Sequence, residues 1–125
     1  MIGIRTPFRM SFVGGGTDLK EFYSRHPGCV LSTTINKYMY ISSHDYFNGD
    51  EIRTKYSKTE TVRAIDDLNH PILRSIMQRL QVSTGLEVSS IADVPSGTGM
   101  GSSSSFTVGT LHNLMARLGR ADEAT

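Results

Sequence analysis

The sequence predicts a single domain in which β-strands alternate with two amphipathic helices. β-branched and aromatic residues alternate with polar ones at 2–13 and 86–94, as they do in half-buried strands. Apolar residues recur at helical spacing at 71–80 and 106–118. The chain has 125 residues, 38% of them hydrophobic, which is enough to bury one core but not two. Residues 1–125 are therefore one domain or a part of one.

The amino-terminal segment should form a strand followed by a short helix. Residues 2–13 favour an extended strand, and Pro7 within them indicates a sheet edge or a break, because proline cannot donate to a β-ladder. The glycine run at 14–16 ends this strand. Apolar residues at helical spacing after Asp18 then predict a short helix that stops at the turn at 26–28.

The middle of the chain should contain further strands. Residues 29–43 are expected to form a strand pair or one long bent strand, interrupted at Asn36-Lys37. A turn at 47–50 precedes a further strand at 52–57.

Two helices lie on either side of the last predicted strand. Pro71 occupies the first turn of one helix, where proline is tolerated, and this helix should end near Thr84-Gly85. The strand at 86–94 leads to the second helix, for which Gly119 is the expected C-cap.

Charge and cysteine content exclude several classes of protein. Thirteen basic and twelve acidic residues give a formal charge of +1, so no broad field is available to hold a nucleic acid or an anionic membrane. Cys29 is the one cysteine, and the four histidines lack ligand spacing, so neither an internal disulfide nor a zinc site is expected. The first residues do not resemble a secretion signal, and no apolar run approaches the ~18 residues of a membrane span. The sequence predicts a cytoplasmic protein with a small-molecule partner.

Residues 93–105 carry the clearest chemical signal. They read Asp-Val-Pro-Ser-Gly-Thr-Gly-Met-Gly-Ser-Ser-Ser-Ser and join a predicted strand to a predicted helix. Glycines let the backbone approach an anion closely, and a helix amino terminus presents unpaired N–H groups to it. Serine hydroxyls can donate to phosphate or bind Mg²⁺. The alternative is a flexible loop with a serine as an ordinary N-cap, but the strand before and the helix after favour a phosphate site. No Gly-Lys-Ser/Thr follows, so the stretch is not a Walker A loop.

Two motifs resemble one enzyme family, the small-molecule kinases that include galactokinase, homoserine kinase, mevalonate kinase and phosphomevalonate kinase (GHMP kinases). Residues 95–103 match the family motif Pro-x-x-x-Gly-Leu-Gly-Ser-Ser, with Met100 in place of leucine. Residues 7–9 and 14–18 have the spacing of a second family motif, Pro-Gly-Arg followed by Gly-Glu-His-Thr-Asp. The amino-terminal stretch looks most like the branch that phosphorylates heptose 7-phosphate, with fucokinases as close relatives. The resemblance implies an α+β fold, a ribosomal protein S5 domain 2-like layer of strands backed by helices. Residues 1–125 would be the partial amino-terminal, ATP-binding domain.

The resemblance also implies roles for individual residues. Arg9 would stand close to the transfer site, where its guanidinium could stabilise charge developing on the γ-phosphate. Asp18 would bind sugar hydroxyls. Mg²⁺ would be bound by Ser103 or, less favoured, by Ser102. The ATP-binding stretch comprises Pro95, Ser96, Gly97, Thr98, Gly99, Met100, Gly101, Ser102, Ser103 and Ser104, and the substrate-binding stretch Gly14, Gly15, Gly16, Thr17 and Asp18.

Each of these roles has a structural alternative. Arg9 could instead pair with a surface carboxylate on an edge strand, and Asp18 could be a helix N-cap. Gly15 and Gly16 replace the Glu-His pair with which galactokinases contact sugar. Their small size should enlarge the pocket for a bulkier, phosphorylated sugar, and the three glycines could form an anion nest. A tight turn would explain one or two of the glycines more easily than three.

The expected activity is ATP-dependent phosphorylation of a sugar, most favourably heptose 7-phosphate at its anomeric hydroxyl. In relatives the catalytic aspartate and a metal-binding glutamate follow the Pro-x-x-x-Gly-Leu-Gly-Ser-Ser motif, beyond this sequence. The 125-residue chain alone is therefore expected to be inactive, and the surface left uncovered should promote self-association. A fucokinase-like enzyme, another sugar kinase and a non-catalytic nucleotide-binding module are the alternatives. RNA binding is a further alternative, because the expected fold is shared with ribosomal proteins, but the near-neutral charge of the chain disfavours it.

Overall fold

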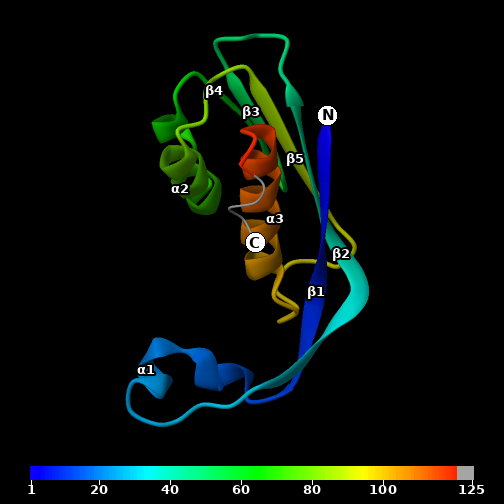
Figure 1. Ribbon diagram of the computed structural model, residues 1–125, viewed down its shortest axis with the longest axis vertical. Coiled ribbons are helices and arrows are strands. Elements are labelled where there is room, and N and C mark those ends of the chain that lie inside the picture. Colours follow the sequence, from blue (N-terminus) through cyan, green and yellow to red (C-terminus); the bar gives the residue numbers. More distant parts are fainter. Residues whose placement is uncertain (121–125) are drawn as a thin grey trace.

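Five strands form one mixed sheet in the computed structural model, which describes residues 1–120. The order across the sheet is β1-β2-β5-β3-β4, and helices α2 and α3 pack on one face of it (Figure 1). The strands are β1 (Ile2–Val13), β2 (Leu31–Asp45), β3 (Ile52–Lys55), β4 (Thr59–Val62) and β5 (Leu86–Ala92). The helices are α1 (Lys20–Tyr23), α2 (Pro71–Leu80) and α3 (Ser102–Arg117), with short 3₁₀-helices η1 (Gly15–Asp18) and η2 (Ile65–Asp67). This arrangement confirms the expected layer of strands backed by helices.

Strands β1 and β2 form a long antiparallel ribbon at one side of the sheet. Their pairing runs from Ile2 opposite Ser43 to Val13 opposite Leu31. The register shifts once where Pro7 faces Tyr38 and again after Ser11. β1 is an edge strand with an irregularity beside its proline, so both meanings predicted for Pro7 are confirmed. The interruption expected at Asn36-Lys37 coincides with this shift inside one long β2.

The central strand β5 pairs antiparallel with β2 and parallel with β3. The connection between the parallel strands contains β4, η2 and α2. β4 is a short hairpin partner of β3 that the sequence analysis did not predict. Its Thr-Glu-Thr-Val sequence has a single strongly apolar residue, so its hydrophobic alternation is too weak to detect.

Helix α2 begins at Pro71, as predicted, and buries one face made of Leu73, Ile76, Met77 and Leu80. Its predicted end near Thr84-Gly85 is wrong, because the helix stops at Leu80. Gln81 takes the left-handed conformation with φ 53°, and the N–H of Val82 turns back to the Met77 carbonyl. Val82 is buried in the core, and this burial favours the end of the helix at Leu80.

Helix α3 lies close against the β1–β2 ribbon. A Cβ on Gly109 would be 2.8 Å from the Thr6 hydroxyl oxygen and 3.1 Å from Cγ1 of Ile41. One turn later, Asn113 is fully buried and donates to the carbonyls of Ile2 (3.0 Å) and Ile41 (3.1 Å). The core between sheet and helices therefore has a polar anchor as well as apolar contacts. Its apolar residues include Phe8, Ile41, Ile52, Leu68, Leu73, Met77, Leu86 and Leu114.

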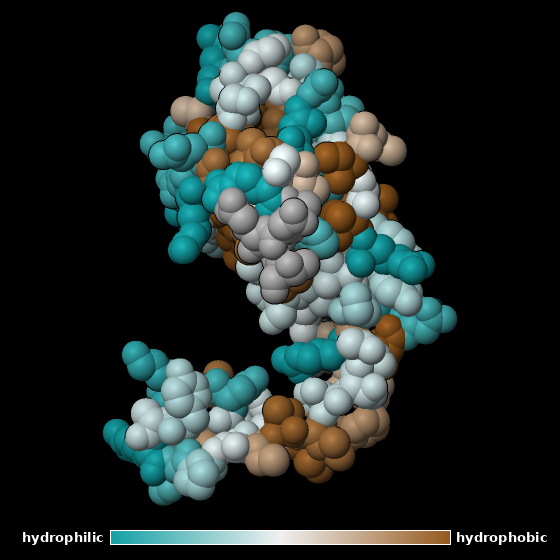
Figure 2. Space-filling model, in the orientation of Figure 1, coloured by the Kyte–Doolittle hydropathy of each residue, from teal (hydrophilic) through white to brown (hydrophobic). Residues whose placement is uncertain are grey.

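Residues 14–30, here called the arm, connect β1 to β2 and project away from the helices (Figure 1). The arm contains η1 and α1, neither of which has a buried residue. Figure 2 shows a deep notch between the arm and the body of the molecule. No helix in residues 1–120 is long and apolar enough to cross a membrane.

Candidate functional site

The loop of residues 93–101, here called the glycine loop, joins β5 to α3. Its three glycines, Gly97, Gly99 and Gly101, have φ values of 79°, 73° and 74°. Side-chain-bearing residues rarely adopt this left-handed conformation, which explains the glycine at each position. A Cβ on Gly97 or Gly99 would meet no atom within 4 Å, so the backbone there borders open space. The loop thus has the positive φ angles and the accessible backbone that an anion cradle requires.

The amino terminus of α3 has free donors. Gly101 is its N-cap residue, no side chain caps it, and the first backbone bond runs from the Ser105 N–H to the Gly101 carbonyl. The alternative in which a serine caps this helix is therefore wrong. The backbone N–H groups of residues 102–104 have no partner within the helix, and they lie at the positive end of its dipole. This end of the 16-residue helix can bind an anionic group.

Arg9 of β1 lies directly against the glycine loop. Its backbone N–H donates to the Met100 carbonyl at 3.0 Å, and its Nη1 donates to the Ser11 hydroxyl at 2.7 Å. A Cβ on Gly101 would come within 3.1 Å of Cγ and 3.2 Å of Nε of the same arginine. Within residues 1–120 Arg9 forms no ion pair with a carboxylate, contrary to the alternative considered for it. The fold thus places a guanidinium beside the loop.

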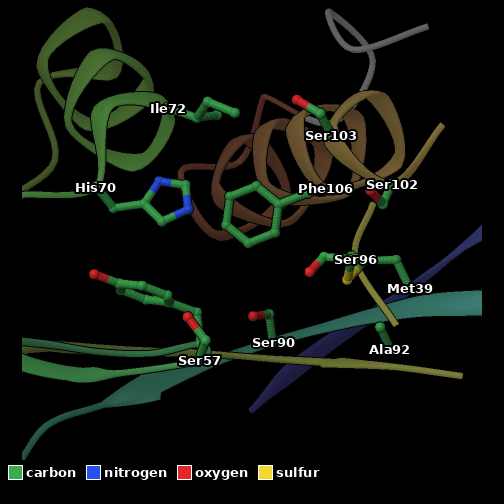
Figure 3. Close-up of a pocket in the computed structure, with 11 residues that line it drawn as sticks. Met39, Ser57, His70, Ile72, Ser90, Ala92, Ser96, Ser102, Ser103 and Phe106 are labelled. Atoms are coloured by element: carbon green, nitrogen blue, oxygen red, sulfur yellow. The ribbon is translucent and has the colours of Figure 1, made fainter. Parts of the chain in front are cut away.

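A cavity of about 470 Å³, here called the loop pocket, opens beside the glycine loop (Figure 3). Hydroxyl-bearing Ser96, Ser102 and Ser103 lie at its loop end, and in Figure 3 Phe106 and His70 lie toward the other. It is lined by residues from β2, β5, α2, α3 and the segments beside them: Met39, Tyr56, Ser57, His70, Ile72, Ser90, Ala92, Ser96, Ser102, Ser103 and Phe106. An aromatic end next to a polar, anion-binding end suits a ligand that has a flat ring and a phosphate chain.

The aromatic end of the loop pocket is built around His70. Its ring centroid is 4.7 Å from that of Tyr56 and 5.0 Å from that of Phe106. Burial lowers the pKa of His70 below its usual 6.5, against the opposing charge of Glu60. The Tyr56 hydroxyl donates to Glu60 at 2.7 Å, which raises the pKa of the tyrosine and lowers that of the glutamate. Sequence reasoning missed these aromatic residues because they come from three separate segments and belong to no motif.

The Gly14–Asp18 segment lies in the arm, and its glycines differ in what they do. Gly14 has φ 80°, and a Cβ there would be 1.9 Å from the Cys29 carbonyl oxygen, so the backbone itself requires this glycine. Gly15 and Gly16 have no positive φ, and a Cβ on Gly16 would meet nothing within 4 Å. The tight-turn alternative therefore accounts for the first glycine alone.

Thr17 and Asp18 have different surroundings. The Thr17 hydroxyl donates to the carbonyls of Gly14 (2.7 Å) and Cys29 (3.1 Å), which closes the base of the arm. Asp18 is exposed and caps no helix, since the N-cap of α1 is Leu19. With Thr17 it lines a cavity of about 320 Å³ beside Tyr23 and Gly28. Its carboxylate is free to bind a ligand.

The structure thus brings together one part of the predicted site and keeps the other apart. Arg9 lies against the glycine loop, and serines of this loop and of the first turn of α3 line the loop pocket. No hydrogen bond within residues 1–120 joins the Gly14–Asp18 segment to the glycine loop. The notch in Figure 2 separates the arm from the body that carries the loop.

The serines are the residues available for a metal ion at the loop. Residues 1–120 contain no group of three or more His, Cys, Asp or Glu side chains that could hold one. The Ser103 side chain is exposed, lines the loop pocket and forms no hydrogen bond among the described residues. A hydroxyl of this kind fits Mg²⁺, which is commonly held by few protein oxygens together with nucleotide phosphates and water.

Comparison with known proteins agrees with this architecture. Residues 62–123 match the family model described as GHMP kinases N terminal domain. The chain is 29% identical over 121 residues to D-glycero-alpha-D-manno-heptose 7-phosphate kinase from Campylobacter jejuni, covering 88% of this chain and 36% of that protein. It therefore spans about a third of the length of this curated relative.

Solved structures share the fold at lower sequence identity. A D-glycero-D-manno-heptose 1-phosphate kinase from Bacteriodes thetaiotaomicron superposes with a TM-score of 0.80 at 21% identity, over 95% of this chain and 42% of that one. Mevalonate kinase from Methanococcus jannaschii gives a TM-score of 0.77 at 20% identity, over 98% of this chain and 43% of that one. The matched domain model, the sequence relative and the shared fold together show that the chain is similar to the GHMP kinases, in sequence over residues 62–123 and in fold over nearly its whole length.

Proposed function

We propose that the full-length protein carrying this sequence transfers the γ-phosphoryl group of ATP to a sugar phosphate. Residues 1–125 would be the amino-terminal, ATP-binding part of that enzyme. The observation that carries the proposal is the glycine loop with its three positive φ angles, set between the free amino terminus of α3 and the loop pocket. This arrangement binds the phosphates and leaves an adjoining cavity for the nucleoside.

Each part of the loop region would then act on the nucleotide in its own way. Backbone N–H groups of residues 96–104 would hold the phosphate chain, and the aromatic end of the loop pocket would hold the purine. Ser103 would bind Mg²⁺, which when present neutralises phosphate charge during transfer. Arg9 would stabilise charge on the transferring group, since its guanidinium lies beside Gly101 and donates to the Ser11 hydroxyl.

The arm would bind the acceptor sugar. Asp18 is exposed and without a hydrogen-bonding partner in the described residues, so it can accept hydrogen bonds from sugar hydroxyls. Gly15 and Gly16 leave space that larger residues would fill. The sequence relative is a heptose 7-phosphate kinase, and we infer the same acceptor here, phosphorylated at the anomeric hydroxyl. Fucose and other sugars are the alternative acceptors.

The test is kcat/KM of the full-length protein on heptose 7-phosphate, fucose and galactose at the same ATP and Mg²⁺ concentrations. A site built to bind a polar group rejects an analogue that lacks it by roughly 10⁴ or more, so heptose 7-phosphate should be strongly preferred. Asp18→Asn should lower kcat/KM for the sugar while leaving ATP affinity unchanged. Equal efficiency on galactose would leave only a sugar kinase of other specificity, and binding of ATP without turnover of any sugar would favour a non-catalytic nucleotide-binding module.

Arg9 supplies a second test of the phosphoryl-transfer reaction. Arg9→Ala should lower kcat by about 10² to 10³ with little change in the ATP dissociation constant, because the stabilisation is needed in the transition state. Arg9→Lys keeps the charge but not the fork of donors, and it should recover part of the rate. An unchanged kcat in Arg9→Ala would reduce this residue to a support for the loop.

A further inference from the structure

The side chain of His70 has a fixed tautomer, and this decides what it offers to the loop pocket. His70 is the N-cap residue of α2, and its Nδ1 accepts a hydrogen bond from the Leu73 N–H at 3.4 Å. An imidazole nitrogen can accept only through its lone pair, so Nδ1 is unprotonated here. In a neutral ring the proton must then be on Nε2.

The surroundings of His70 keep the ring neutral and held in place. Burial is the main cause of its lowered pKa, and Glu60 on β4 is the charged group that opposes this effect. Glu60 is itself held by the Tyr56 hydroxyl and by the Asn69 N–H. Tyr56 presents a ring edge at an interplanar angle of 80°, and Phe106 of α3 is tilted by 31° to the imidazole. The ring is therefore fixed from three elements.

The protonated nitrogen is directed into the loop pocket. In Figure 3 one ring nitrogen of His70 faces α2, and the other faces away from it, toward Phe106 and the pocket interior. Nε2 forms no hydrogen bond within the described residues. At the aromatic end of the pocket, His70 thus offers a single N–H donor in a fixed direction.

We propose that His70 selects the nucleobase by donating this Nε2–H to an acceptor nitrogen on the edge of a purine that lies against Phe106. The inference rests on the nucleotide site proposed above and adds the residue that reads the base. The serine end of the pocket is equally suited to any phosphate chain, so discrimination among nucleotides has to come from the aromatic end. A donor without an acceptor nearby prefers a base edge that carries a ring nitrogen.

The experiment compares ATP, inorganic tripolyphosphate and three ATP analogues that lack one ring acceptor each, 1-deaza-, 3-deaza- and 7-deaza-ATP. Binding is measured by calorimetry to the full-length protein and to His70→Ser. Serine keeps an oxygen that can cap α2 but removes the Nε2 donor. We expect His70→Ser to weaken ATP binding by roughly tenfold, the value of one neutral hydrogen bond, and to leave tripolyphosphate binding unchanged.

One deaza analogue should bind the wild-type protein about tenfold more weakly than ATP does. The His70→Ser variant should bind this analogue and ATP with equal affinity. His112→Ser, on α3 and outside the pocket lining, is the matched control and should bind all ligands like the wild type. If His70→Ser does not fold, His70→Asn keeps a capping oxygen and takes its place.

The outcomes separate this inference from the proposed function. Unchanged ATP affinity in folded His70→Ser, equal losses for ATP and tripolyphosphate, or three deaza analogues that bind like ATP would each overturn the reading of the base by His70 while leaving the nucleotide site intact. A wild-type protein that binds neither ATP nor tripolyphosphate would overturn the nucleotide site itself, and His70 selection with it.

Discussion

At the residue scale, the glycine loop shows how a spacing of two along the chain becomes a backbone conformation. Gly97, Gly99 and Gly101 all have φ between 73° and 79°, and each intervening residue keeps an ordinary negative φ. A side chain at these positions is opposed by its own backbone, whatever space is available. The first two glycines also border open space, where a Cβ would project into the volume assigned to phosphate.

Gly99→Val should weaken ATP binding by tenfold or more without unfolding the protein, because it distorts the loop and fills the cradle. Calorimetric titration with ATP measures the loss. Gly119→Val is a matched control, since Gly119 at the other end of α3 has the same φ of 73°, and a Cβ there would also meet no atom of residues 1–120 within 4 Å. It should show the same backbone strain with normal ATP affinity. Equal affinities for ATP in both variants would contradict the assignment of the cradle.

The sequence predicted this loop well because its chemistry is local. The glycine spacing, the preceding strand and the following helix are contiguous, and each was read correctly from adjacent residues. The sequence carries no comparable signal for His70, because the role proposed for it depends on Tyr56 and Phe106, which lie 14 positions before it and 36 after it in the sequence. Such a site is assembled by tertiary packing, which periodicity and motifs do not encode.

At the scale of elements, the fully buried Asn113 anchors α3 to the sheet. Asn113 donates to carbonyls of two different strands and accepts from the Ser43 hydroxyl. Asn113→Ala should lower the free energy of unfolding by about 2 to 4 kcal/mol, because buried acceptors and a hydroxyl lose their partner. Val108→Ala removes an exposed side chain from the same helix and should change stability by less than about 0.5 kcal/mol. Urea denaturation of both variants measures the difference, and similar values would mean that Asn113 is no anchor.

The far face of the sheet holds a buried carboxylate that makes stability depend on pH. Glu87 of β5 is 7% exposed and accepts from Nζ of Lys55 at 2.7 Å, with Nε2 of His44 at 3.8 Å. The hydrogen bond from Lys55 is the main cause that lowers the pKa of Glu87 below its ordinary 4.5. A lowered folded-state pKa stabilises the protein above the unfolded pKa, and this stabilisation is lost as pH falls through the folded value.

Glu87→Gln should therefore destabilise the protein by about 1 kcal/mol at pH 7, and by less at an acidic pH below the lowered pKa of the wild-type carboxylate. Denaturation curves at the two pH values measure the change. Asp45→Asn is the control, since Asp45 pairs with Arg117 but its side chain is 88% exposed, and it should shift the pH dependence far less. A Glu87→Gln curve parallel to that of the wild type would exclude the carboxylate as the titrating group.

Strong periodicity separates the elements that the sequence predicted from those that it did not. β1, β5 and α3 were predicted to within a few residues because each carries a long apolar pattern or a glycine boundary. β4 was missed, and the end of α2 was misplaced, because both are decided by contacts elsewhere. β4 exists by pairing with β3, and α2 ends where Val82 enters the core.

At the scale of the whole molecule, the base of the arm carries a large apolar surface. Figure 2 shows brown side chains gathered there. Phe12 is 61% exposed, Val13 64% and Leu31 61%, and Leu19 and Val30 add to them. An exposed apolar patch of this kind commonly marks an interaction surface. It adjoins β1, a strand of 12 residues that lies at the edge of the sheet.

The 125-residue chain should accordingly self-associate at micromolar concentrations, and sedimentation equilibrium measures this. Replacing Phe12 and Leu31 together by serine should weaken association by roughly tenfold or more, since apolar burial drives it. Phe47→Ser is the control, because Phe47 is 88% exposed in the turn after β2, away from the arm. A wild-type chain that sediments as a monomer, or a control that dissociates equally, would count against the patch as the contact surface.

The backbone bond from Arg9 to Met100 has a consequence for how two ligands influence each other. Arg9 holds the glycine loop, and five positions later the same strand becomes Gly14 and the arm. A displacement of β1 at one end should therefore be transmitted to the other, so under the proposed function we expect the affinities for acceptor and nucleotide to be thermodynamically linked. Linkage is reciprocal: the factor by which bound sugar phosphate changes the dissociation constant of the nucleotide must equal the factor in the opposite direction. Titrating each ligand in the absence and presence of the other would give this coupling factor. A value of one would mean that β1 bends and does not transmit a displacement between the arm and the glycine loop.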